Sequence, residues 1–192
     1  MEKNEVEMLY PKNREEWRNW LVKNHIKKPS VWLIQYKKSA NMPTISWSDA
    51  VEEALCFGWI DSVRKSIDAE RFIQFFTKRK PKSAWSKINK AKILHLTEAG
   101  LMTQAGQESV NRAKENGSWI ILDEVEELLV PEELDQAFKE NLEAKMFFSS
   151  LSKSVRKAIL QWIAFAKRPE TKSKRIAEVV ELASQKKKPK QF

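Results

Sequence analysis

The pattern of apolar and polar positions predicts two amphipathic helices in the first half of the chain. The first covers residues 13–24, with Asn13 as its N-cap, and the second covers residues 48–57. Gly58 follows the second helix at the position where a helix-ending glycine is expected. The apolar residues at helical spacing are Trp17, Trp20 and Leu21 in the first helix and Trp47, Ala50, Val51, Ala54 and Leu55 in the second.

Three stretches rich in branched and aromatic residues predict strands at 31–37, 59–66 and 71–77. The short link "DAE" between the last two favours an antiparallel hairpin. A small antiparallel sheet of about three strands with helices packed on it makes an α+β unit, which we place at residues 1–82.

After "KRKPKS" the strand pattern stops, so residues 83–192 are predicted to be mainly α-helical. The expected helices are 84–98, 103–116 and four more that start near residues 131, 141, 152 and 169. A further division near residue 130 is possible on this pattern. The basic tail "KKKPKQF" is expected to fray.

Composition describes a globular chain with a strongly basic balance. Of 192 residues, 42% are hydrophobic and 32% charged, and the net charge is +9. Lys78–Lys92 holds seven cations and no acid, whereas Glu115–Lys145 holds ten acids against two lysines. Two interpretations follow: the acidic and basic surfaces face each other in the fold, or a basic patch stays open for an anionic partner.

The sequence carries no familiar catalytic or cofactor motif. Two distant histidines, one cysteine and four glycines provide no catalytic triad, no metal-ligand spacing and no glycine-rich phosphate loop. We therefore predict no catalytic residues, no metal site and no cofactor. Cys56 lies near a helix end that disfavours a thiolate, so we interpret it as a buried structural residue.

The N-terminus lacks an apolar signal-peptide core, and no apolar run approaches the roughly 18 residues of a membrane span. A cytoplasmic protein without a membrane span is expected.

Two polar residues of the predicted strand 59–66 could belong to a site. On a regular strand Asp61 shares a face with Trp59, and Arg64 lies on the opposite face. Asp61 then needs its own partners, either as a structural acceptor or as part of a ligand site.

The segment "TKRKPKSAWSKINK" is the strongest candidate for a binding site in the sequence. Cations flanking a helix start form an anion site, and cations interleaved with an aromatic residue also suit single-stranded nucleic acid. The alternative is that Trp85 belongs to the core and the lysines are solvated. The candidate ligand-binding residues are Trp59, Asp61, Arg64, Arg79, Lys82, Trp85, Ser86 and Asn89.

Several blocks together resemble the YdeI/OmpD-associated family of bacterial proteins. They are "EALCFGWIDSVRKSID", "KRKPKSAWSKINK", "AGLMTQAG" and "WIAFAKRPETKSKRI", and residues 130–185 look like the C-terminal helical module of that family. The family usually shows Pro-Arg after the third strand, whereas this chain has Lys78-Arg79, so Arg79 matches the arginine. The resemblance implies a bacteriocin-protection or stress-response protein, linked to tolerance of cationic antimicrobial peptides, with no established enzyme activity.

We therefore expect a non-enzymatic binding or stress-tolerance protein that takes a small anion or an acidic protein partner through a basic, Trp-containing patch. Direct capture of a cationic peptide is disfavoured by the net charge of +9. Two alternatives remain. One is nucleic-acid binding through Lys78–Lys92 and the basic tail, and the other is an unrecognised enzyme that uses Asp61.

Overall fold

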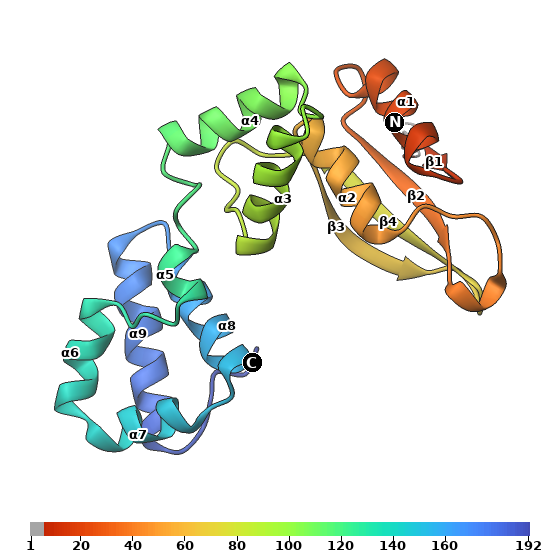
Figure 1. Cartoon of the computed structure of the whole chain (residues 1–192). Helices are drawn as coiled ribbons and strands as arrows, with labels where there is room; N and C mark the ends of the chain where they lie inside the picture. The colour runs from red at the N-terminus through yellow and green to blue at the C-terminus, as the bar shows by residue number, and fades with distance from the viewer. Residues whose placement is uncertain (1–5) are drawn as a thin grey trace, which may run out of the picture. The chain divides into compact units, whose positions relative to one another are not determined.

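The computed structural model describes residues 6–192, which form two compact units (Figure 1). The first unit contains the residues through Ser83 together with Ile88–Ser118. The second contains Ala84–Lys87 and Trp119–Phe192. The sequence predicts one boundary between residues 82 and 83, whereas the two helices between Lys87 and Glu115 lie mainly with the sheet, and the main segment of the second unit begins at Trp119.

A four-stranded mixed sheet forms the centre of the first unit, in the order β1-β2-β4-β3. The three predicted strands are confirmed, and they pair with one another in the antiparallel sense. The added edge strand β1 pairs in parallel with β2 and has only two residues, too few to show a sequence pattern. The strands are β1 (Met8–Leu9), β2 (Ser30–Tyr36), β3 (Trp59–Ser66) and β4 (Arg71–Lys78).

The helices of the first unit are α1 (Arg14–Asn24), α2 (Trp47–Cys56), α3 (Lys87–Glu98) and α4 (Gln104–Glu115), with a 3-10 turn η1 (Lys38–Ala40). Asn13 caps α1 as predicted, since its side chain accepts a hydrogen bond from the Glu16 amide. The Trp17 ring of α1 packs on Phe76 of the sheet, with centroids 5.5 Å apart, and its indole donates to the Ala50 carbonyl of α2. One face of the sheet is thereby joined to α1 and α2.

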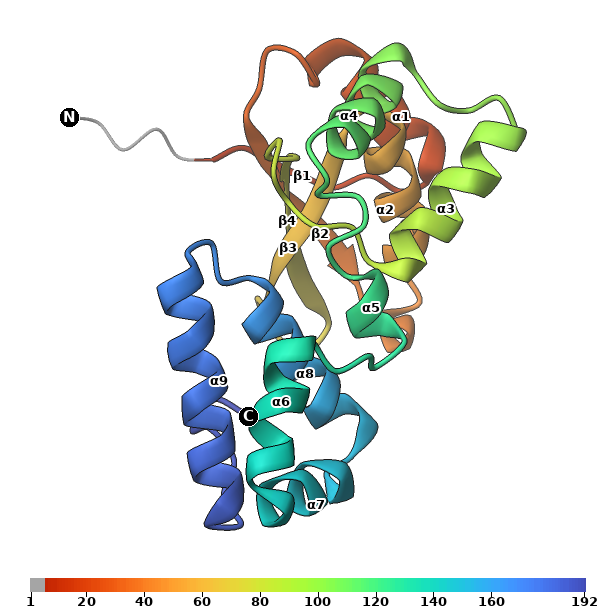
Figure 2. The same cartoon turned by 90° about the vertical axis from the view of Figure 1, so that its left-hand side faces the viewer.

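The second unit is helical and is built around α9. Its helices are α5 (Asp123–Glu126), α6 (Glu132–Glu140), α7 (Leu142–Ser150), α8 (Lys153–Ala164) and α9 (Pro169–Ser184). Helix α9 packs against α6, α7 and α8 (Figure 2). The predicted N-caps of α7 and α8 are confirmed, because Asn141 and Ser152 accept hydrogen bonds from the amides of Ala144 and Val155.

The basic tail does not fray as expected. Pro189 is buried and Phe192 packs on Trp162, with ring centroids 6.0 Å apart. The apolar residues of the tail therefore attach it to the second unit, although lysines surround them. The α+β class, with a mainly helical second half, is confirmed. No helix among the described residues is long and apolar enough to cross a membrane.

Candidate functional site

A recess of about 220 Å³, here called the Arg79 cleft, lies within the first unit where α2 ends. The turn after α2, the adjoining ends of β3 and β4, the residues after α1 and one side of α4 provide its walls. The lining residues are His25, Ile26, Phe57, Gly58, Trp59, Lys78, Arg79, Ala105, Glu108, Ser109 and Arg112.

Two glycines allow α4 to approach the end of α2. Gly58 has a φ of +71°, and a Cβ there would lie 3.0 Å from the Ala105 carbonyl oxygen. A Cβ at Gly106 would overlap the carbonyl of Cys56. That carbonyl also accepts hydrogen bonds from the amide and the hydroxyl of Thr103, at 3.1 and 2.6 Å. The start of α4 is therefore fixed against α2, and Glu108, Ser109 and Arg112 follow along the cleft.

Arg79 is the most buried cation of the cleft, with 9% of its surface exposed. Burial lowers the pKa of Arg79 to about 10, and the negative charge of Asp61 acts in the opposite direction. The guanidinium thus stays charged at neutral pH while it is poorly solvated. The neighbouring Lys78 ammonium donates to the Ile26 carbonyl at 2.6 Å, and the buried Trp59 indole donates to the His25 carbonyl at 3.3 Å.

Asp61 lies on the sheet face rather than among the residues that line the cleft. Its Oδ2 accepts hydrogen bonds from the Trp47 indole at 2.9 Å and from the Gln74 amide at 3.1 Å. Gln74 is itself buried and also donates to the Ser62 carbonyl. Asp61 therefore connects the start of α2 to β3 and β4, as a structural acceptor would.

The prediction that Asp61 and Arg64 lie on opposite faces is wrong. Asp61 pairs with Phe76 and Arg64 with Gln74, so a bulge between them adds one residue to β3. Partners across antiparallel strands share a face, and Phe76 and Gln74 are two residues apart on β4. Both polar side chains therefore lie on the same face. The Arg64 guanidinium stacks over the Phe72 ring, with its central carbon 3.6 Å from the centroid.

The remaining predicted site residues lie outside the cleft. Lys82 is exposed in the loop after β4, and Asn89 is half-buried on α3. Trp85 and Ser86 belong to the second unit. Trp85 is 1% exposed there and packs against Trp119, with ring centroids 5.1 Å apart. Of the predicted set, only Trp59 and Arg79 line the Arg79 cleft.

Many of the clustered charges have partners within their own unit. The second unit contains four ion pairs between lysines and acids: Lys87–Glu127, Lys145–Asp135, Lys157–Glu126 and Lys172–Glu133. In the first, Lys92 binds Glu52 at 2.6 Å. Facing acidic and basic surfaces thus account for part of the charge pattern. Nucleic-acid binding through Lys78–Lys92 stays a prediction.

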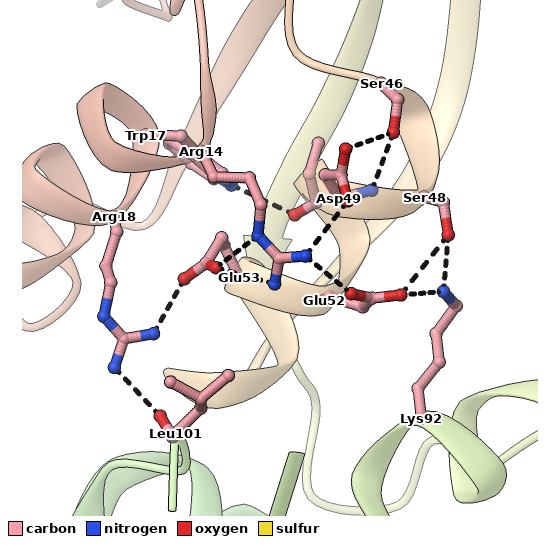
Figure 3. A network of polar contacts seen from close by, with 11 residues as sticks. Arg14, Trp17, Arg18, Ser46, Ser48, Asp49, Glu52, Glu53, Lys92 and Leu101 are labelled. Carbon is pink, nitrogen blue, oxygen red and sulfur yellow. Dashed lines mark hydrogen bonds and ion pairs between the residues drawn. The ribbon is translucent and has the colours of Figure 1, made fainter. Parts of the chain in front are cut away.

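A polar network that the sequence did not suggest joins α1, α2 and α3 (Figure 3). Glu53 of α2 is 3% exposed and receives hydrogen bonds from Arg14 at 2.9 Å and from Arg18 at 2.7 Å. Arg14 also binds Asp49 and Glu52, and Lys92 binds the other oxygen of Glu52. Three cations offset three carboxylates, which indicates a structural network. Pairing across helices leaves no periodic signal in the sequence.

Burial acts to raise the pKa of Glu52, but hydrogen bonds and charge from Lys92 and Arg14 outweigh it, so its pKa is lowered. Burial raises the pKa of the Cys56 thiol, and Cys56 is fully buried, which agrees with a structural cysteine. No group of three or more histidine, cysteine, aspartate or glutamate residues within residues 6–192 is placed to hold a metal ion.

Fold and cleft together define a class: an α+β unit with a cationic recess, followed by a helical module. Residues 9–109 match the family described as "Domain of unknown function (DUF8412)", and the chain belongs to that family. Residues 127–186 match the family described as "Bacteriocin-protection, YdeI or OmpD-Associated", which confirms the predicted resemblance for the helical module. No curated protein and no solved structure matches the chain.

Proposed function

We propose that the protein is a non-enzymatic binding protein that takes a small anion, or an acidic group of a partner, in the Arg79 cleft. The observation that carries the proposal is the charge of the lining: Lys78, Arg79 and Arg112 accompany a single carboxylate, Glu108. A buried guanidinium has lost much of its hydration, so an anion next to it is attracted more strongly than at an open surface.

The match of the helical module to a bacteriocin-protection family supports a role in stress tolerance. Direct capture of cationic peptides fits poorly with a net charge of +9, and acids of the segment 126–135 already pair with lysines. We therefore favour an indirect role, in which the first unit recognises an anionic ligand or an acidic partner.

Titration calorimetry with pyrophosphate tests the proposal. The Arg112→Gln variant should bind about tenfold more weakly than the unmodified protein, a loss equivalent to about 1.4 kcal/mol, because one charge-assisted contact is removed. Arg112 is preferred to Arg79 as the target, since Arg79 is buried and its replacement would also affect folding.

Lys82→Gln is the matched control, because it removes one positive charge from an exposed loop residue outside the cleft. Its affinity should stay within about twofold of the unmodified protein, as expected for a screened surface charge. Equal weakening by both changes would mean that the ligand responds to the overall field of the protein and that the cleft is not the site.

A further inference from the structure

A second cavity, here called the Arg64 cavity, lies at the other end of α2, where that helix begins. Its volume is about 460 Å³, and it shares no lining residue with the Arg79 cleft. Cavities of about 300–1,000 Å³ commonly hold small molecules. Its lining combines three aromatic rings with three cations, which are Tyr36, Trp47, Phe72, Lys37, Lys38 and Arg64.

The bulge in β3 brings Arg64 into this cavity. Without the extra residue, Arg64 would lie on the other face of the sheet. The Phe72 ring supports one face of the guanidinium at 3.6 Å, which fixes its orientation. A planar guanidinium that is stacked in this way presents its N–H edge to a carboxylate or a phosphate.

A buried acceptor gives an independent sign of a ligand. Gln35 lines the cavity and is 1% exposed. Its Nε2 donates to the Ile45 carbonyl at 2.9 Å, which sets the orientation of the amide. The other atom of that amide, Oε1, has no hydrogen-bond partner among the described residues. Buried acceptors are nearly always paired, so a donor on a bound molecule would complete this one.

Trp47 offers a surface for a ring. Its indole N–H is held by Asp61 at 2.9 Å, while 47% of the residue is exposed. It is the first residue of α2, and Ser46, the N-cap, lines the same cavity. The positive end of the helix dipole adds to the attraction for an anion there, although the nearby Asp49 and Asp61 oppose it.

We propose that the Arg64 cavity binds an aromatic anion about the size of a nucleoside monophosphate. The aromatic ring lies against Trp47, the anionic group is taken by Arg64 with Lys37 or Lys38, and an N–H or O–H of the ligand donates to Gln35. This site is independent of the anion proposed for the Arg79 cleft, and either can exist without the other.

The test uses the whole protein labelled with 15N and two probes, adenosine monophosphate and indole-3-acetate, which carry a phosphate and a carboxylate. At least one probe should shift the Trp47 indole and Gln35 amide signals and should saturate below about 5 mM. Adenosine lacks the anion and ribose 5-phosphate lacks the aromatic ring. Each should bind at least about tenfold more weakly than the better probe.

Variants assign the binding to the cavity. Arg64→Gln should weaken the better probe about tenfold, and Gln35→Met, which keeps the length of the side chain, should weaken it severalfold. Arg112→Gln should leave it unchanged, and Arg64→Gln should leave pyrophosphate binding unchanged. Proper folding of each variant is checked from its amide spectrum.

The proposal is overturned if neither probe saturates, if ribose 5-phosphate binds as well as the aromatic anions, or if a folded Arg64→Gln variant binds like the unmodified protein.

Discussion

Single residues decide how closely the helices of the first unit approach one another. Gly106 is buried and lies where a Cβ would overlap the Cys56 carbonyl. The sequence shows a glycine inside a predicted helix but not the reason for it, because the contact joins residues 50 positions apart. Cys56 could be interpreted correctly from its place near a helix end, whereas Arg64 could not, since a bulge leaves no pattern.

The Gly106→Ala change should destabilise this protein, although the same change usually stabilises a helix. In an exposed helix this change stabilises by about 1 kcal/mol through helix propensity. Here the new methyl group would displace the backbone at the end of α2, so the free energy of unfolding should fall by about 2 kcal/mol. Urea denaturation measures the change, and Gln104→Ala, at an exposed position of the same helix, should stay within about 0.5 kcal/mol. A more stable Gly106→Ala variant would contradict the observed packing.

At the scale of elements, hydrophobic periodicity predicts most helices and strands, because each amphipathic element buries one face. The missed elements, β1, η1 and α5, have two to four residues, too few for a period to appear. Helix α3 is predicted from residue 84 but begins at Lys87, and the buried Trp85 lies before its start. Trp59 and Arg79, two of the candidate residues predicted from the sequence, line the Arg79 cleft. Arg112 lines it too but could not be predicted, because only the tertiary contact between α2 and α4 brings it there.

The polar network of α1, α2 and α3 predicts a loss of stability in acid. The folded-state pKa of Glu52 is lowered, so its contribution is complete above the unfolded pKa, about 4.3, and is lost as the pH falls through the folded value. The Glu52→Gln variant should lose about 1–2 kcal/mol at pH 7 and show a shallower decline below about pH 5. Urea midpoints measured from pH 7 to 3 provide the readout.

The exposed Glu15 on α1 provides the control for this change. The Glu15→Gln variant should stay within about 0.5 kcal/mol of the unmodified protein at neutral pH, because its exposed charge in the first turn of α1 interacts only weakly with the helix dipole. If Glu52→Gln retains the same acid slope as Glu15→Gln, the network does not couple protonation to folding.

At the scale of the whole molecule, the chain forms two units, and each unit consists of two separate segments of the sequence. Ala84–Lys87 belongs to the second unit, although the following residues return to the first. The tilted rings of Trp85 and Trp119 pack against each other within the second unit, so the two segments of that unit are joined by their aromatic residues. The sequence placed Trp85 in a binding patch or in a core, and its burial supports the core.

Trp85→Ala should therefore destabilise the second unit. Removal of a buried indole costs about 3 kcal/mol or more. Hydrogen exchange should speed up in α6–α9, while amides of β2 and β4 keep their protection. Trp17→Ala is the matched change for the first unit, because Trp17 is also buried and packs on the sheet. Loss of protection in β2 and β4 on replacing Trp85 would contradict the assignment of this residue to the second unit.

An amide and indole NMR titration of the 15N-labelled protein with pyrophosphate tests whether the end of α2 carries an anion site. We predict saturable shifts at the Gly58 amide and the Trp59 indole, which belong to residues lining the Arg79 cleft. In Arg112→Gln, half-saturation of the same shifts should need about tenfold more pyrophosphate. Shifts confined to exposed lysines of the segment 78–92, with Gly58 and Trp59 unchanged at saturation, would contradict a site at the end of α2.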